Sequence, residues 1–272
     1  MNSTLWLAYF HQNQLHRREP VWNAPTSMPP TVARHLARSL SHFQLGESGE
    51  GKFLLAEARR SYPSDVAYCQ ALDLFIKEEQ EHARLLGHLV ARFGGSLIRS
   101  HWTHFLFRLL RRALSVHFEI QILVIAELVG TAYYRLLERY ASDAALAEVC
   151  ALILRDEGQH VAFHAERCRA NQARSLPIEY AAWAAQFQLF FVVAAHVAWT
   201  DHRPALTALG TTRAEFFSET RREAIAFLDD VAGARSDEIR TPDGMSMPRT
   251  VAPERIEGDA SGNEELISAR ET

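Results

Sequence analysis

The pattern Glu-x-x-His occurs twice in this chain, at residues 79–82 and 157–160. Residues three positions apart share one face of an α-helix, so the glutamate and histidine of each copy can meet the same cation. Apolar residues recur at three- or four-residue spacing around both copies, which predicts that this face is buried. A single copy is common on solvated helices. Two copies on buried faces point instead to a helical bundle with a metal site.

Isolated glutamates lie on the apolar stripes of two other segments. Glu127 stands within the apolar run at residues 124–129, while Glu47 and Glu50 lie on the stripe of an earlier segment. A carboxylate among apolar side chains is costly unless a positive charge meets it. Short turns between the segments would form two antiparallel hairpins and bring these groups to one level.

Two divalent cations would neutralise four such carboxylates, and two imidazoles would complete their coordination. The predicted metal ligands are Glu79, His82, Glu127, Glu157, His160 and either Glu47 or Glu50. The spacing of the internal repeat slightly favours Glu50, and both residues stay open as ligands. His164, one helical turn beyond the second pattern, is expected to be a core histidine.

Each predicted ligand glutamate of the two patterns is preceded by another acidic residue, Glu78 in one case and Asp156 in the other. A histidine that binds a metal through one ring nitrogen usually donates the other to a carboxylate or carbonyl. We expect Asp156 to orient His82 in this way. We expect Glu78 to orient His160.

The rest of the chain predicts an all-α protein. Apolar periodicity indicates core helices near residues 31–61, 65–93, 103–141 and 143–173, and two further helices before residue 232. The proline-containing residues 1–30 are expected to form an irregular arm. Residues 233–272, rich in Ser, Gly, Pro and acidic residues, are expected to be a disordered tail. One helical domain, residues 31–232, lies between them.

Composition narrows the function classes. A formal net charge of −4 argues against the broad basic surface that binds nucleic acid. The three cysteines are far apart, which offers neither a zinc knuckle nor a disulfide framework and favours the cytoplasm. Residues 181–199 are apolar enough to span a bilayer, but two glutamines and a histidine interrupt them. We therefore expect this segment to pack against the bundle and expect no membrane association.

The ordered set Glu, Glu-x-x-His, Glu, Glu-x-x-His resembles the di-iron carboxylate branch of the ferritin-like superfamily, over residues 31–173. That branch includes rubrerythrins, acyl-carrier-protein desaturases, ribonucleotide reductase small subunits and bacterial multicomponent monooxygenases. The resemblance implies a ferritin-like four-helix bundle, here with two additional C-terminal helices. The stretch Gly46-Glu47-Ser48 is similar to the first helix of rubrerythrins and favours Glu47. The cysteine pairs that form the rubredoxin-like domain of full rubrerythrins are missing here, which makes peroxide scavenging a less favoured function.

Oxygen-rich ligation suits iron, with manganese as an alternative metal. We expect a non-haem di-iron oxidase or oxygenase that uses O2 as co-substrate to oxidise a small organic substrate, with electrons from a separate reductase. One alternative is a ferroxidase, peroxidase or manganese catalase of the ferritin-like type. Another is a metal-free helical binding protein. A homodimer is one option for the oligomeric state.

Overall fold

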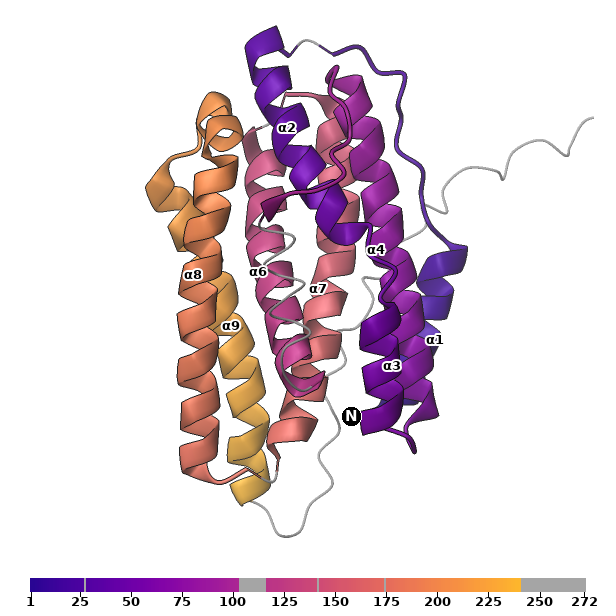
Figure 1. Ribbon diagram of the computed structural model, residues 1–272, viewed down its shortest axis with the longest axis vertical. Helices are drawn as coiled ribbons and strands as arrows, with labels where there is room; N and C mark the ends of the chain where they lie inside the picture. The colour runs from indigo at the N-terminus through magenta and orange to yellow at the C-terminus, as the bar shows by residue number, and fades with distance from the viewer. Residues whose placement is uncertain (27, 103–115, 141, 174, 241–272) are drawn as a thin grey trace, which may run out of the picture.

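The structure is a computed structural model that describes residues 1–26, 28–102, 116–140, 142–173 and 175–240, with backbone alone for 234–240. Across these residues the chain forms helices joined by turns, with no strand (Figure 1). The prediction of an all-α protein is therefore confirmed. The start of the predicted third core helix, residues 103–115, lies outside the described residues, as does most of the predicted tail, residues 241–272.

The described helices are α1 (Ser3–Leu15), α2 (Pro30–Glu47), α3 (Lys52–Ser61), α4 (Val66–Arg92), α6 (Val116–Tyr140), α7 (Ala144–Gln172), α8 (Pro177–Leu209) and α9 (Arg213–Arg240). Helices α6 and α7 pack together along their length, and α2 packs against α4, which also contacts α7. Helix α1 covers the outer side of α4, while α8 and α9 lie against α6 on the opposite side of the molecule (Figure 1).

The N-terminal arm contains a helix, so the prediction of an irregular segment is wrong for residues 3–15. The side chain of Asn2 caps α1 by accepting a hydrogen bond from the backbone N–H of Leu5. Phe10 is fully buried and packs edge-on against Phe163 of α7. The hydroxyl of Ser3 donates to Asp65, the residue that caps α4. Tertiary packing therefore holds a helix that has little apolar periodicity of its own.

The predicted first core helix is divided into α2 and α3 by residues 48–51. Gly51 immediately precedes α3 and has a backbone φ of 59°, a left-handed conformation that residues with a side chain disfavour. A Cβ at this position would also lie 2.3 Å from the Cδ1 of Ile76. Glycine is thus required both by backbone conformation and by space. Glu47 becomes the last residue of α2, immediately before the break.

The C-terminal helices are longer than predicted. Helix α8 does not end near Pro204 but continues to Leu209, where Gly210 terminates it in a left-handed conformation. The buried Ala205 and Leu206 hold this last part against the bundle, which offsets the hydrogen bond that the proline removes. Helix α9 runs to Arg240, so residues 233–240 belong to a helix and not to the predicted tail.

Helices α6 and α8 are each long and apolar enough to cross a membrane by length and composition alone, which is weak support for a membrane protein. In α6, 89% of the most apolar stretch is buried inside the protein, as expected for a core helix. In α8 the corresponding share is only 17%, and Leu189, Val192 and Val193 are exposed. The expectation that residues 181–199 would be buried against the bundle is therefore wrong for most of the helix.

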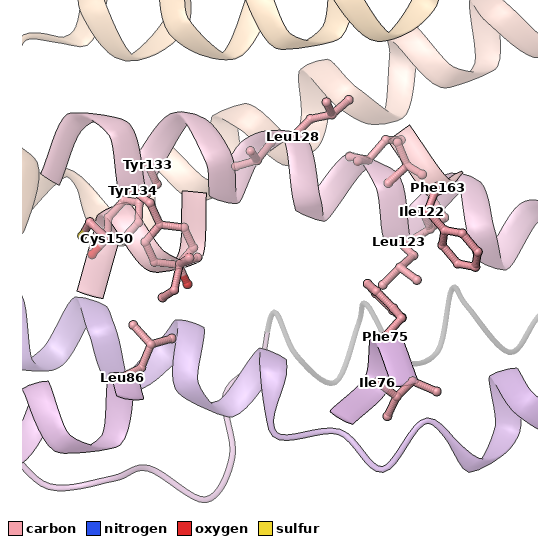
Figure 2. Packing of buried hydrophobic residues seen from close by; sticks show 14 of the residues in the cluster. Phe75, Ile76, Leu86, Ile122, Leu123, Leu128, Tyr133, Tyr134, Cys150 and Phe163 are labelled. Atoms are coloured by element: carbon pink, nitrogen blue, oxygen red, sulfur yellow. The ribbon is translucent and has the colours of Figure 1, made fainter. Parts of the chain in front are cut away.

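Among the members of the single apolar cluster that Figure 2 draws, two sets lie apart along the bundle, with Leu128 between them. One set contains Leu86, Tyr133, Tyr134 and Cys150, and the other contains Phe75, Ile76, Ile122, Leu123 and Phe163. In α4, α6 and α7 alike, the predicted metal ligands lie in sequence between members of the two sets. The polar cluster is therefore enclosed by apolar layers at both ends.

The three cysteines are free thiols in the same core. Cys69 lies on α4, while Cys150 and Cys168 lie on α7. All three side chains are buried, and Cys150 is 1% exposed. Each belongs to the apolar cluster.

Candidate metal centre

Four side chains from α4 and α7 form a compact and largely buried group that could hold a metal ion: Glu79, His82, Glu157 and His160. One ligand atom from each lies within 4.8 Å of the others. The Nδ1 of His160 is 3.0 Å from Glu79 Oε1 and 3.8 Å from Glu157 Oε2. The Nδ1 of His82 lies 3.5 Å from Glu79 Oε1 and 3.6 Å from Glu157 Oε1. The two sequence patterns therefore meet face to face.

Glu127 enters the group from α6. Its Oε2 lies 3.9 Å from the Nδ1 of His160, and its side chain is 4% exposed. The charged residues with the largest effect on this carboxylate are Glu157, Glu79 and His160. This is the setting that the apolar run around Glu127 predicted.

Glu47 enters the group from α2, which makes α2, α4, α6 and α7 the four helices around it. The Tyr134 hydroxyl donates a hydrogen bond to Glu47 Oε1. The Oε2 of Glu47 is buried and interacts electrostatically with Glu79, His82 and Glu157.

Glu50 does not join the group, which corrects the preference for it over Glu47. Its side chain is 70% exposed and pairs with Lys52 at 2.7 Å. The break at residues 48–51 ends the helical register on which that preference depended. Glu50 therefore points to solvent beyond the end of α2, and Glu47 occupies the position at the cluster.

The second nitrogen of each histidine is held as the sequence predicted. His82 Nε2 lies 3.2 Å from Oδ2 of Asp156, and His160 Nε2 lies 2.9 Å from Oε2 of Glu78. Both contacts cross between α4 and α7, because each acidic residue lies beside the histidine of the opposite helix. With Nε2 donating to a carboxylate, Nδ1 of each ring is left facing the cluster.

Sequence reasoning missed the outer support of these carboxylates. The amide Nδ2 of Asn13, on α1, donates to Glu78 Oε1 at 2.7 Å and to Asp156 Oδ1 at 3.0 Å. Arg17 lies 3.4 Å from Glu78, and Arg155 donates to Asp156 at 2.9 Å. Only the pairing of neighbouring acidic and basic residues 155 and 156 was visible in the sequence. The role of α1 depends on where that helix packs.

Burial and crowding act strongly on the carboxylates. Burial raises the pKa of Glu47 well above its ordinary value, and the negative charge of Glu79 adds to this. The pKa of Glu127 is raised by burial and by the charges of Glu157 and Glu79. Burial also raises the pKa of Glu79, but its ion pairs with His160 and His82 outweigh this, and the pKa is lowered. The positive charge of the two histidines is therefore too little to stabilise all of these carboxylates in their ionised form.

The two imidazoles respond in the opposite direction. Burial lowers the pKa of His82, but contacts with Asp156 and Glu157 outweigh it, so the pKa is raised well above 6.5. The pKa of His160 is raised in the same way, chiefly by Glu127 and Glu157. Without another cation, protons on the rings supply part of the positive charge that the carboxylates demand.

Several buried polar atoms at the centre make no hydrogen bond of normal geometry. They are Glu47 Oε2, Glu79 Oε1, His82 Nδ1, Glu157 Oε2 and His160 Nδ1. Buried polar atoms nearly always have a partner, and such exceptions need an explanation. Here all five belong to predicted metal ligands on three helices. Carboxylate oxygens and imidazole nitrogens are ligands for divalent metals, so the residues present fit a metal centre.

The remaining candidates lie beside this group. His164 is fully buried, with its ring 4.9 Å from that of Phe75, and is not part of the four-residue group, as expected for a core histidine. Tyr133 shares a hydrogen bond of 2.6 Å with Ser39. Tyr68 lies under the guanidinium of Arg167 at 3.7 Å. Of the three buried tyrosines, Tyr134 is therefore the one bonded to a predicted ligand.

Comparisons of the chain with protein-family models, with curated proteins and with solved structures gave no match. Functional inference therefore starts from the side chains of the cluster. Two surface hollows lie next to α4. One, of about 580 Å³, lies between α2 and the end of α4. The other, of about 620 Å³, lies between α1 and the start of α4. None of the cluster residues lines either hollow.

Proposed function

We propose that this protein is a di-iron carboxylate protein with a ferritin-like bundle, and that it uses O2 to oxidise a small organic substrate. The observation that carries the proposal is the convergence, in a buried acidic centre, of ligand atoms that make no hydrogen bond of normal geometry. Each histidine there is already held through its outer nitrogen, with the inner nitrogen left for a metal. That arrangement is the one expected of metal-bound imidazole.

Charge and ligand type support two iron ions. The residues that would hold them are Glu47, Glu79, His82, Glu127, Glu157 and His160. Four carboxylates balance two divalent cations, and a set dominated by oxygen suits iron or manganese better than a small tetrahedral zinc site. When bound, two ferrous ions would supply O2 with two electrons.

The chain's own residues would keep the centre dry and fixed. The buried Phe75, Leu123 and Phe163 would cover one end of the cluster, and the buried Leu86 and Tyr133 would cover the other; Figure 2 shows these two sets apart along the bundle. Glu78 and Asp156 hold the imidazole rings in orientation, so little rearrangement is needed on binding. Reduction of O2 to water takes four electrons. The organic substrate would supply two of them, and we assign the supply of the other two to a separate reductase.

Metal analysis with oxygen uptake tests the proposal. The protein is loaded anaerobically with ferrous iron, desalted and exposed to O2 while its optical spectrum and O2 consumption are followed. We expect about two iron ions per chain. Glu127→Gln should lose iron, whereas Glu138→Gln, an exposed glutamate on the same helix, should not. Wild-type protein that keeps less than one metal ion per chain would overturn the proposal in favour of a metal-free helical binding protein.

A second function is favoured by the enclosure of the cluster. The side chains of His160 and Glu157 are 0% and 3% exposed, and small reactants such as Fe²⁺ or peroxide need less space to reach a buried centre than an organic molecule does. A ferroxidase, peroxidase or manganese catalase would need no more than this. Fast peroxide turnover without a reductase, or selective retention of manganese over iron, would identify this second function.

A further inference from the structure

A second group of metal-ligand side chains shares no residue with the first, although α2 contributes to both. It consists of His42 on α2, His101 in the segment that follows α4, and Asp201 on α8. One ligand atom from each lies within 4.8 Å of the others. His101 Nδ1 is 3.9 Å from Asp201 Oδ2, and the rings of His42 and His101 have centroids 4.0 Å apart. None of the three residues belongs to the di-iron candidate.

All three side chains are only partly buried. Nδ1 of His42 is buried and makes no hydrogen bond, which is unusual for a ring nitrogen inside a protein. The side chains of His101 and Asp201 are 19% and 14% exposed, so a cation can reach them from solvent. Water can then fill a remaining coordination position.

The neighbouring polar residues are engaged elsewhere. His202, beside Asp201, is hydrogen-bonded through Nδ1 to the hydroxyl of Ser39 at 2.8 Å. Its ring stands edge-on to that of His42, with centroids 5.7 Å apart, and so packs against one side of the group. The exposed Arg38 interacts electrostatically with both His42 and Asp201. Its positive charge opposes a cation, so the affinity should be lower than that of an all-carboxylate site.

We propose that His42, His101 and Asp201 bind one divalent transition-metal ion of the zinc class, independently of the cluster between α4 and α7. Two imidazoles and one carboxylate, with a position left for water, are a known zinc ligand set. Ligands about 2.0–2.1 Å from a tetrahedral zinc lie about 3.3–3.5 Å apart. The three ligand atoms lie within 4.8 Å of one another, and His101 Nδ1 is 3.9 Å from Asp201 Oδ2, so small side-chain rotations would bring them into that range.

The ion would join three elements that are distant in sequence. It would connect α2 to α8 and would fix the segment after α4 to both. Helix α8 is otherwise largely exposed, so a cross-link near its C-terminal part would stabilise its attachment. Binding to the folded chain alone stabilises that chain in proportion to the logarithm of metal concentration.

Zinc titration of full-length variants tests the site. Bound zinc is counted per chain for wild type, Asp201→Asn and His101→Gln, with His35→Gln as the control because His35 is exposed on α2. We expect both site variants to bind about one zinc fewer per chain than wild type, while the control binds the same number. Glu157→Gln should retain the zinc that the site variants lose, which separates this site from the di-iron proposal.

Thermal melting in the same samples tests the cross-link. Zinc should raise the Tm of wild type and of His35→Gln more than that of Asp201→Asn or His101→Gln, and a chelator should reverse the difference. Equal zinc content in wild type and both site variants would overturn the binding site. An equal Tm increase in all four proteins would overturn the cross-link. Circular dichroism without zinc establishes that each variant is folded before these comparisons.

Discussion

The amide of Asn13 donates a 2.7 Å hydrogen bond to the carboxylate of Glu78, and so ties the first helix to the support of the candidate metal centre. The same nitrogen lies 3.0 Å from Asp156, the partner of the other histidine. A single amide on α1 thus restrains both carboxylates that hold the imidazole rings. Helix α1 is therefore part of the site's architecture as well as a cover for α4.

Substitution of Asn13 by leucine should weaken iron binding without unfolding the protein. The change keeps a similar volume but removes the donor, leaving Glu78 and Asp156 to repel each other more strongly. We expect iron affinity to fall by about tenfold, at the low end for groups that support metal ligands. Chelator competition measures this. Gln14→Leu, an exposed position on the same helix, is the control, and an equal loss there would reject the role of Asn13.

Substitution of Asp156 by alanine should have a larger effect than the loss of Asn13. His82 would lose the acceptor 3.2 Å from its Nε2, and its ring would be free to turn away from the cluster. We expect a loss of about 10- to 100-fold in iron affinity. Asp73→Ala, which removes a surface pair with Lys77 on α4, is the matched control. Unchanged iron content in Asp156→Ala would rule out its orienting role.

Glu47 and Glu50 make a pair of variants with opposite expected outcomes. Glu47→Gln replaces a buried carboxylate at the cluster and should lower the iron content, since the charge that balances the cations is reduced. Glu50→Gln changes an exposed side chain and should leave iron content unchanged. Elemental analysis of both proteins after identical loading decides between them. Loss of iron in Glu50→Gln alone would restore the assignment that the internal repeat favoured.

Asp143 should contribute stability that depends on pH. Its carboxylate accepts hydrogen bonds from Arg92 and from the backbone N–H of Leu146, at the start of α7. Burial raises the pKa of Asp143, but these bonds outweigh it and the folded pKa is lower than usual. A lowered folded pKa means that the stabilisation is complete above the unfolded pKa, about 3.9, and is lost as pH falls through the folded value.

Asp143→Asn therefore provides the test, because asparagine still caps a helix but carries no charge. The variant should be about 2 kcal/mol less stable than wild type at pH 7, and the difference should shrink below about pH 4. Urea unfolding at several pH values measures it. A difference that stays constant down to pH 3 would contradict the ionic contribution.

Gly51→Ala should destabilise the protein by about 1–3 kcal/mol. The new side chain would have to adopt a backbone φ of 59° and would press on Ile76, whose Cδ1 would be 2.3 Å from the added carbon. Gly46, five residues earlier in α2, has nothing within 4 Å of such a carbon. Gly46→Ala should therefore be neutral or stabilising by up to about 1 kcal/mol. Thermal or urea unfolding of the two variants gives the comparison.

Helix positions followed closely from the sequence where local chemistry sets the boundary. The predicted helices at 65–93 and 143–173 correspond to α4 (Val66–Arg92) and α7 (Ala144–Gln172). Asp65 and Asp143 cap them through their side chains, which is a local signal. The break before Gly51 depends on backbone conformation, and α1 depends on packing against distant helices. Neither leaves a periodic pattern in the sequence.

The site was predictable to a similar degree. The two Glu-x-x-His patterns and Glu127 share an apolar setting that shows in the sequence, and the structure brings them together. The choice between Glu47 and Glu50 required knowledge of where α2 ends. The bonds of Asn13 could not be foreseen, because they join residues about 65 and 143 positions away along the chain.

The buried cysteines allow opening of the core to be followed by thiol labelling. Burial raises the pKa of Cys168 to about 12, so its thiol is protonated and enclosed in the folded protein. Alkylating reagents attack the thiolate, and they need access to it. Since the cysteines lie on the two helices that carry the Glu-x-x-His patterns, their labelling rate would record how often those helices separate. Slower labelling after iron loading would show that bound metal holds the two helices together.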